Sequence, residues 1–146
     1  MSTTEISIFR REGVDIRVVA KQLGVPLAGY EQHLYVVELV DRGVKVGITG
    51  QPYTRLRAHM RDVDAYGREI GRIALTAPHS NARTNERSLV ALGGIGNHRE
   101  YIDMRFDAAV EAIRSMAFDR ADRAAVAARS AAVTGLFKSM LMGEAS

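Results

Sequence analysis

The sequence predicts an α/β (α+β) domain: a small antiparallel three-stranded sheet flanked by helices, followed by a helical C-terminal extension. Three observations support this fold class. Two runs rich in β-branched residues, 34–40 and 44–49, are separated by a short turn sequence, which is typical of a β-hairpin. Apolar residues before and after the hairpin recur at helical spacing. A chain of 146 residues is long enough to bury a single core.

The elements up to the hairpin follow from local patterns. Residues 14–24 form a short amphipathic helix that ends at Gly24. Its AKQLGV sequence resembles the start of a helix-turn-helix, but the chain then leads into a strand, so we expect a helix that only packs on the sheet. Residues 34–40 are apolar on both faces, as in a buried strand. The DRG turn that follows has Gly43 where a left-handed residue is needed.

The remaining elements complete a domain of one sheet. Pro52 suits the first position of a helix, which we expect to reach about residue 63. A third strand is expected at 70–76, and a polar residue at 80–81 caps a helix that ends at Gly93. From residue 107 the chain is helical to its end. We therefore divide it into an N-terminal helical segment (1–31), the sheet domain (32–112) and a C-terminal helical extension (113–146).

Composition excludes several classes of protein. With 47% hydrophobic and 25% charged residues, the chain is not expected to be disordered. No apolar run approaches the ~20 residues that cross a bilayer, and the N-terminus lacks the apolar stretch of a secretory signal. These features predict a cytoplasmic protein. Because the chain has no cysteine, it can form neither a disulfide nor a thiolate metal site.

Positive charge is modest in amount but clustered. The formal net charge is +3, and only three of the 20 cationic residues are lysines. Arginine suits bidentate contacts with phosphate, so the clustering indicates a nucleic-acid backbone as a partner. The alternative is a general compositional preference for arginine over lysine. The clustered arginines are Arg55, Arg57, Arg61, Arg68, Arg72, Arg83, Arg87 and Arg99.

The hairpin is expected to have one apolar and one polar face. If Val40 faces Val44 across the turn, alternation places Tyr35, Lys45, Gly47 and Thr49 together on the polar face. A glycine inside a strand weakens the strand unless something must approach closely, and a phosphate is a candidate for that role. The alternative is a tyrosine–lysine pair at an ordinary solvated edge. The opposite face carries Val36, Val46 and Ile48.

The helix after the hairpin places cations beside its buried stripe. Arg55 and His59 lie four residues apart along one border, and Arg57 and Arg61 lie along the other. Cationic groups held on a rigid helix are preorganised for phosphate. The alternative for His59 is a structural role in the core. The expected buried stripe consists of Tyr53, Leu56, Met60 and Val63.

Glu86 is the most informative carboxylate. Its spacing from Ala82 and Leu89 predicts that it shares the apolar face of its helix. A carboxylate that faces a core costs several kcal/mol unless it is paired or binds a metal. Either an arginine such as Arg55 or a hard cation such as Mg²⁺ could satisfy it. Both alternatives place Glu86 beside the polar face of the hairpin.

Residues 32–112, about half the chain, resemble the GIY-YIG nuclease superfamily. The first motif is similar to HLY, ending in Tyr35, and the second to KVG, from Lys45 to Gly47. Arg55 stands eight residues after that glycine, His59 follows four residues later, and a helix carries the glutamate. KVGIT, RLRAH and the later REYIDM are most similar to the T5orf172/MUG113-like branch of phage and fungal proteins. Lysine replaces the second tyrosine of the family.

The resemblance implies a divalent-metal-dependent DNA endonuclease that hydrolyses phosphodiester bonds. Tyr35 would help to deprotonate the attacking water, with Lys45 beside it, while Arg55 and His59 stabilise charge on the phosphoryl oxygens. A single Mg²⁺ or Mn²⁺ ion held by Glu86 and waters would stabilise the leaving oxygen. The expected contacts to the DNA backbone are Gly47, Thr49, Arg57, Arg61 and Asn97, the last being the nearest match to the family asparagine.

Two other functions remain open. The domain could keep the fold without catalysis and serve as a DNA-binding or regulatory module. The chain could instead be an assembly protein that acts through its C-terminal helices. The sequence GLFKSMLMGE is too apolar for a free helix end, so we expect it to pack on the sheet of its own chain, with a homodimer as the second choice.

Overall fold

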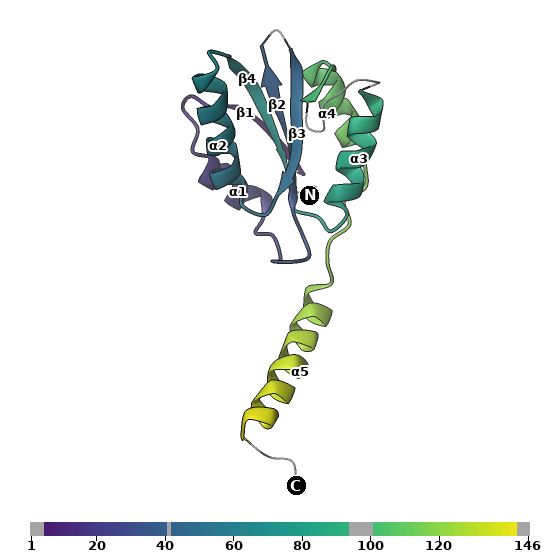
Figure 1. The fold of residues 1–146 in the computed structure, drawn as a ribbon. Coiled ribbons are helices and arrows are strands. Elements are labelled where there is room, and N and C mark those ends of the chain that lie inside the picture. The colour runs from purple at the N-terminus through teal and green to yellow at the C-terminus, as the bar shows by residue number, and fades with distance from the viewer. Residues whose placement is uncertain (1–4, 41, 94–100, 143–146) are drawn as a thin grey trace.

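The computed structural model describes residues 5–40, 42–93 and 101–142, and within them the chain forms an α+β fold (Figure 1). A five-stranded antiparallel sheet has the strand order β1-β4-β2-β3-β5. In chain order the elements are β1 (Ile6–Arg10), α1 (Ile16–Leu23), β2 (His33–Leu39), β3 (Gly43–Thr49), α2 (Pro52–Ala65), β4 (Ile70–Thr76), α3 (Ala82–Leu92), β5 (Tyr101–Ile102), α4 (Phe106–Arg114) and α5 (Arg123–Met142).

The sheet is larger than the sequence predicted. The three expected strands are its centre, β2, β3 and β4, so the α+β class is confirmed. However, residues 6–10, which fall in the expected N-terminal helical segment, form β1 and pair with β4. Without β1, the backbone of β4 would present an unpaired edge. At the other side, β5 pairs with Val44 and Lys45, and the residues that precede β5 lie outside the described part of the chain.

The hairpin register differs from the expected one by two residues. Tyr35 lies opposite Gly47 and Leu39 lies opposite Gly43, whereas we expected Val40 to face Val44. A shift of two residues preserves the alternation of side chains, so the predicted division between the two faces is unchanged. Gly43 has φ +95°, and a Cβ there would also clash with the backbone carbonyl of Ile102 in β5.

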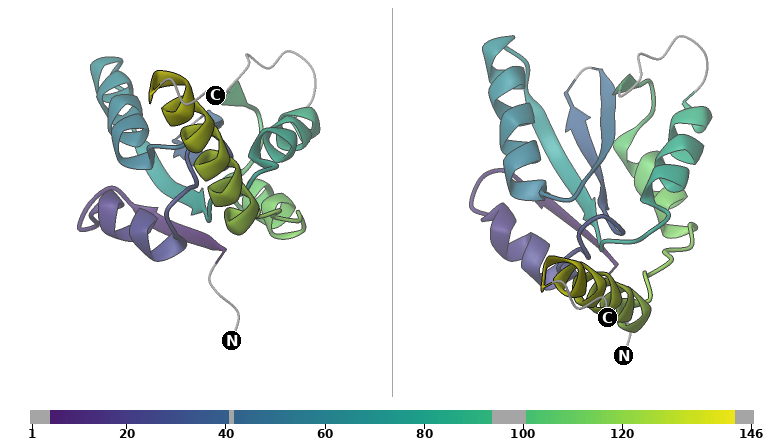
Figure 2. Two further views of the ribbon diagram at one scale, coloured as in Figure 1. Left: turned by 90° about the horizontal axis from the view of Figure 1, so that it is seen from below. Right: turned by 60° about the horizontal axis from the view of Figure 1, so that its bottom comes forward.

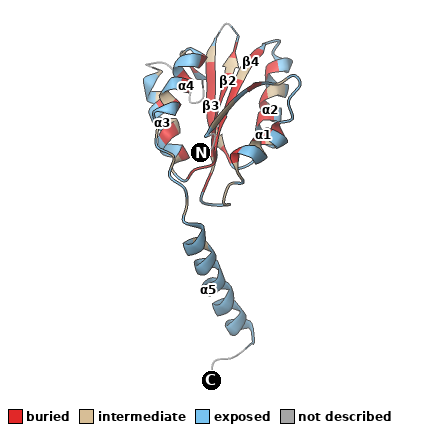
Figure 3. Cartoon of the chain, turned by 180° about the vertical axis from the view of Figure 1, so that it is seen from behind, coloured by how far each residue is buried: buried red, intermediate tan, exposed pale blue. Residues whose placement is uncertain are grey.

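Helices cover both faces of the sheet. α1 and α2 lie on one face, and α3 and α4 lie on the other (Figures 1 and 2). Burial in Figure 3 is concentrated in the strands and on the helix surfaces that face them. Each face has its own apolar cluster. The α1/α2 face buries Tyr35, Val37, Leu39, Leu56, Ile73 and Leu75, and the α3/α4 face buries Leu34, Val36, Val46, Leu89, Phe106 and Ile113.

A buried carboxylate joins the loop before β2 to the start of α5. The Glu31 side chain has no exposed surface, and its oxygens accept hydrogen bonds from Arg120 at 2.8 Å and Arg123 at 2.7 Å. Backbone N–H groups of Leu27 and Ala121 also donate to it. Burial alone would raise the pKa of Glu31, but these hydrogen bonds outweigh burial and lower the pKa below its ordinary value.

The expectation that the C-terminal helix packs on its own sheet is wrong. The structure describes all of α5, and none of its residues is buried. The helix extends away from the sheet domain (Figure 1), and the Glu31 ion pairs hold the segment from which it starts. Within the described residues, no helix combines the length and the apolar character needed to span a bilayer.

We predict that Glu31→Gln lowers the free energy of unfolding by about 1–3 kcal/mol, because a neutral amide cannot satisfy two arginines. The folded-state pKa of Glu31 is depressed, so its contribution is complete above the ordinary value of 4.5 and is lost as the pH falls below it. Urea unfolding of both proteins at several pH values should therefore show the difference shrinking in acid. The exposed Glu111→Gln is the control, and an equal change in that variant would contradict the prediction.

Candidate functional site

Tyr35 and His59 form a buried hydrogen-bonded pair between the sheet and α2. The Tyr35 hydroxyl lies 2.7 Å from Nε2 of His59, and the ring centroids are 5.3 Å apart. Tyr35 is 1% exposed and His59 is 4% exposed. Which of the two donates the proton depends on the imidazole tautomer. His59 therefore has a partner on the predicted polar face, and its burial fits the structural role in the core as well as the functional interpretation.

Gly47 provides the space for the Tyr35 ring. The two residues are directly opposite in the β2–β3 register, and a Cβ at Gly47 would overlap the hydroxyl and the ring of Tyr35. We expected this glycine to admit a phosphate; the structure fills the space above it with the tyrosine instead. A close approach still explains why the strand has a glycine, but the approaching group belongs to the protein.

Lys45 and Thr49, on the same face of β3, have structural contacts as well. The Lys45 ammonium lies 5.0 Å from the centroid of the Tyr101 ring, across the β3–β5 pair, and the residue is 8% exposed. The Thr49 hydroxyl accepts a hydrogen bond from the backbone N–H of Gln51 at 2.9 Å. Thr49 thus stabilises the turn that leads into α2.

A cavity of about 270 Å³ lies beside the Tyr35–His59 pair, between the end of α2 and the edge formed by β3 and β5. Both His59 and Lys45 line it, so two of the expected site residues meet there. Its rim is aromatic, because Tyr66 is 81% and Tyr101 is 41% exposed. A polar cavity with several cations and aromatic rings suits a phosphate and an attached base. Arg42, Asp62 and Arg68 complete the polar lining.

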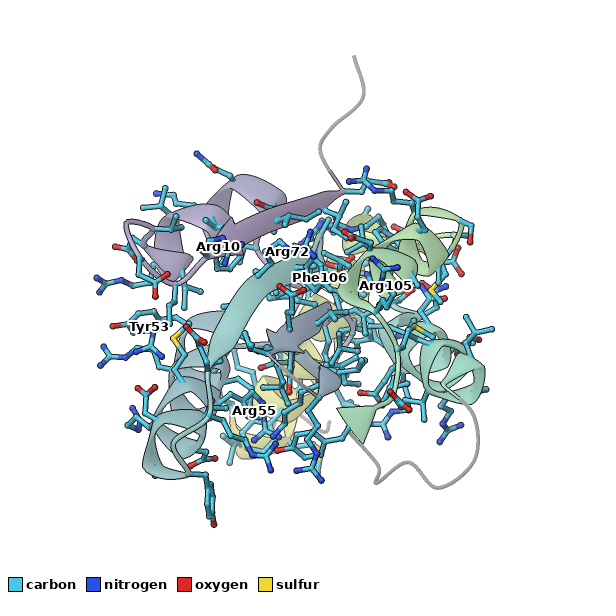
Figure 4. The ribbon with its side chains drawn as sticks, turned by 90° about the horizontal axis from the view of Figure 1, so that it is seen from above. Arg10, Tyr53, Arg55, Arg72, Arg105 and Phe106 are labelled. Carbon is cyan, nitrogen blue, oxygen red and sulfur yellow. The ribbon has the colours of Figure 1, made fainter. Side chains whose placement is uncertain are left out.

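The cations of α2 point in different directions. Arg55 is exposed, and Figure 4 shows it on the side of α2 nearest β3, whereas Tyr53 lies on the side nearest α1. Arg57 donates a hydrogen bond to the Tyr53 hydroxyl at 2.6 Å, and Arg17 of α1 stacks on the same ring. Arg61 is exposed. Arg55 and His59 therefore remain the candidates on the β3 side, and Arg57 faces away from them.

Glu86 lies on the opposite layer of the domain from Tyr35. The buried residues of α3 are Ala82, Asn85 and Leu89, and Leu89 belongs to the cluster on the α3/α4 face. Glu86 itself is half-buried, so it stands at the border of the apolar face and does not point into the core as expected. Although α2 and α3 cover different faces, β3 lies between them (Figure 1).

The donor set around Glu86 limits the kind of metal site. Among the residues that the structure describes, no three His, Asp or Glu side chains are grouped as metal ligands. A single half-buried carboxylate fits Mg²⁺ or Mn²⁺ bound mainly by waters and substrate oxygens, which is the usual way that Mg²⁺ binds at phosphate sites. It does not fit an ion enclosed by protein ligands.

Arg72, one of the clustered arginines, has a structural role. Arg72 binds both oxygens of Glu38, at 3.1 and 2.9 Å, and Asp107 at 2.9 Å. Its guanidinium also stacks on Phe106, 4.5 Å from the ring centroid (Figure 4). The hydrogen bonds that Arg72 donates to Glu38 and then to Asp107 raise the pKa of Arg72 further above its ordinary value. Arg72 therefore ties β2, β4 and α4 together and is not available to phosphate.

Sequence reasoning missed several residues that line the cavity. Tyr66 ends α2 and Tyr101 belongs to β5, and only their exposure indicates a role. Arg42 and Asp62 carried no distinguishing local pattern. One expected residue, Asn97, lies outside the described part of the chain.

In comparisons with protein-family models, curated proteins and solved structures, the chain has no significant match.

We predict that Gly47→Ala lowers the free energy of unfolding by about 1–3 kcal/mol, because the new methyl group displaces the Tyr35 ring. The same change should cost less in a Tyr35→Leu background, where the ring is absent, so a double-mutant cycle measured by denaturant unfolding should show coupling. Gly50→Ala is the matched control, since a Cβ at that position meets nothing within 4 Å. Additive effects would contradict the assigned contact.

Proposed function

We propose that the chain is a divalent-metal-dependent DNA endonuclease that hydrolyses phosphodiester bonds beside β3, at the cavity lined by His59 and Lys45. The observation that carries this proposal is the buried Tyr35–His59 hydrogen bond of 2.7 Å beside a cavity lined by cations. A hydrogen-bonded pair of titratable groups at the wall of a polar cavity is a typical arrangement for proton transfer.

The Tyr35–His59 pair acts as one proton-accepting group. An imidazole is a common general base, and a hydrogen bond at one ring nitrogen fixes its tautomer. His59 lines the cavity and Tyr35 lies behind it, so the imidazole would accept the proton of the attacking water at Nδ1 while its Nε2–H donates to the Tyr35 hydroxyl. Nδ1 is buried in the structure, so this step requires the cavity wall at His59 to open. Tyr35 then holds the imidazole in place through its position over Gly47.

Cations on two elements bind the phosphate. Lys45 at the cavity wall and Arg55 on the β3 side of α2 would stabilise negative charge on the phosphoryl oxygens. Glu86, on the other flank of β3, would hold Mg²⁺ or Mn²⁺ together with waters, and the ion supplies a positive charge for the leaving 3′ oxygen.

A DNA-binding or regulatory module without catalysis is the second candidate. It is favoured by the enclosure of Tyr35, which is 1% exposed, and by the half-buried position of Glu86 on the other layer. The cations around the cavity would then bind the backbone of DNA without cleaving it.

We expect the protein to nick supercoiled plasmid in Mg²⁺ or Mn²⁺ and His59→Ala or Glu86→Gln to reduce the rate by about 100-fold or more. Tyr35→Phe should reduce it at least about 10-fold, since the imidazole loses its partner. Arg57→Ala is the matched control on α2 and should leave cleavage unchanged. If the protein binds DNA but cuts it in neither metal, the proposed endonuclease activity is wrong and the DNA-binding module is the supported function.

Salt dependence of DNA affinity separates the arginines that contact phosphate from those that do not. Replacing Arg55 with Ala should reduce the slope of log K against log salt by about 1, because one phosphate contact is lost. Arg72→Ala should leave the slope unchanged and lower stability instead, because Arg72 is bound to Glu38 and Asp107. Equal slopes for wild type and Arg55→Ala, measured by fluorescence anisotropy, would show that Arg55 does not contact the DNA backbone.

A further inference from the structure

α5 presents large apolar side chains to solvent. Leu136 is 66%, Phe137 61% and Met140 73% exposed, and Val133 is exposed to a similar extent. Burying large apolar side chains is favourable, so a helix that leaves several of them in water has a strong tendency to acquire a partner.

These side chains form one continuous stripe. Val126, Val133 and Met140 are seven residues apart, and Leu136 and Phe137 lie between the last two at the same side of the helix. The opposite side carries mainly small residues, with one lysine and, in the last turn, Met142. Its smaller members and the lysine are Ala127, Ala131, Gly135, Lys138 and Ser139. The bulky apolar side chains from Val126 to Met140 therefore lie on one side of α5, and only the last turn departs from this division.

Two alternative partners for the stripe are disfavoured. The sheet domain does not cover it, because the helix extends away from the domain (Figures 1 and 2) and Arg120 and Arg123 hold its start on Glu31. A membrane surface would need the cations on one polar side. Arg129 and Lys138 are nine residues apart, which places them on opposite sides of the helix, with Arg129 inside the stripe.

We propose that the stripe of α5 pairs with the same stripe of a second copy of this chain, with the two helices antiparallel. With Val133 at the centre, Val126 of one copy meets Met140 of the other. The Arg129 guanidinium then lies beside Phe137 of the second copy, where a cation–π contact satisfies it. A parallel pair would place the two Arg129 side chains against each other in the seam, which like charge disfavours.

The available area is enough for a weak dimer. Twenty residues make a helix about 30 Å long with an accessible surface on the order of 1,200 Å². A partner helix covers about half of that surface, so the dimer buries about 1,200 Å² in total. This is the lower end of the range for specific interfaces, where weak and transient complexes are found, so we expect association only at micromolar or higher concentrations. The dimer does not depend on nuclease activity.

Sedimentation of the full chain from about 1 to 200 µM tests the association. We expect a monomer–dimer equilibrium in this range and a monomer throughout for Phe137→Glu, which places a carboxylate in the stripe. Ala131→Glu introduces the same charge on the opposite side of the helix and should still dimerise. A wild-type monomer at all concentrations, or equal loss in both variants, would overturn the proposal.

The absence of native cysteine allows the orientation to be tested by disulfide formation. Val126→Cys and Met140→Cys proteins, one carrying a size tag, should cross-link when mixed and oxidised but not when each is oxidised alone. Val133→Cys should cross-link to itself, and Ala131→Cys, on the far side of the helix, is the negative control. Self-cross-linking of Met140→Cys without the mixed product would overturn the antiparallel arrangement.

Discussion

The contact between Tyr35 and Gly47 is the constraint on which the rest of the candidate site depends. The phenol of β2 lies over Gly47 of β3, which has no side chain, and its hydroxyl reaches His59 of α2. This one side chain therefore joins two strands and a helix. It also holds the imidazole, which forms part of the cavity wall.

Carboxylates bind several arginines of this basic chain. The Glu31 side chain is buried and that of Glu38 is partly buried, and each binds arginine from a distant segment. Such pairs contribute positioning more than stability, because desolvation offsets much of the attraction. Glu38 holds Arg72 between β2, β4 and α4, while Glu31 holds the start of α5. The arginine content of the chain therefore does not by itself predict how many arginines can contact a binding partner.

The two edges of the sheet have different roles. β1 pairs with residues 72–76 of β4, whereas among the described residues β5 pairs with Val44 and Lys45 of β3. The strand β3 runs between α2 and α3, which belong to opposite layers of the domain (Figure 1). The central strands were predictable because β-branched residues and a turn sequence are local signals. β1 was missed since its pairing with residues about 65 positions away has no local signal.

The sequence by itself determined the hairpin, the order of helices and strands from residue 33 to 92, and the face shared by Tyr35, Lys45 and Gly47, because strand alternation and helical periodicity are local. Only the tertiary structure decided that Gly47 accommodates a tyrosine instead of a phosphate. It also placed Glu86 on the other layer and left α5 unburied. These outcomes depend on which faces of the helices pack on which face of the sheet. Side-chain size and charge pairing between segments far apart in the sequence determine this packing.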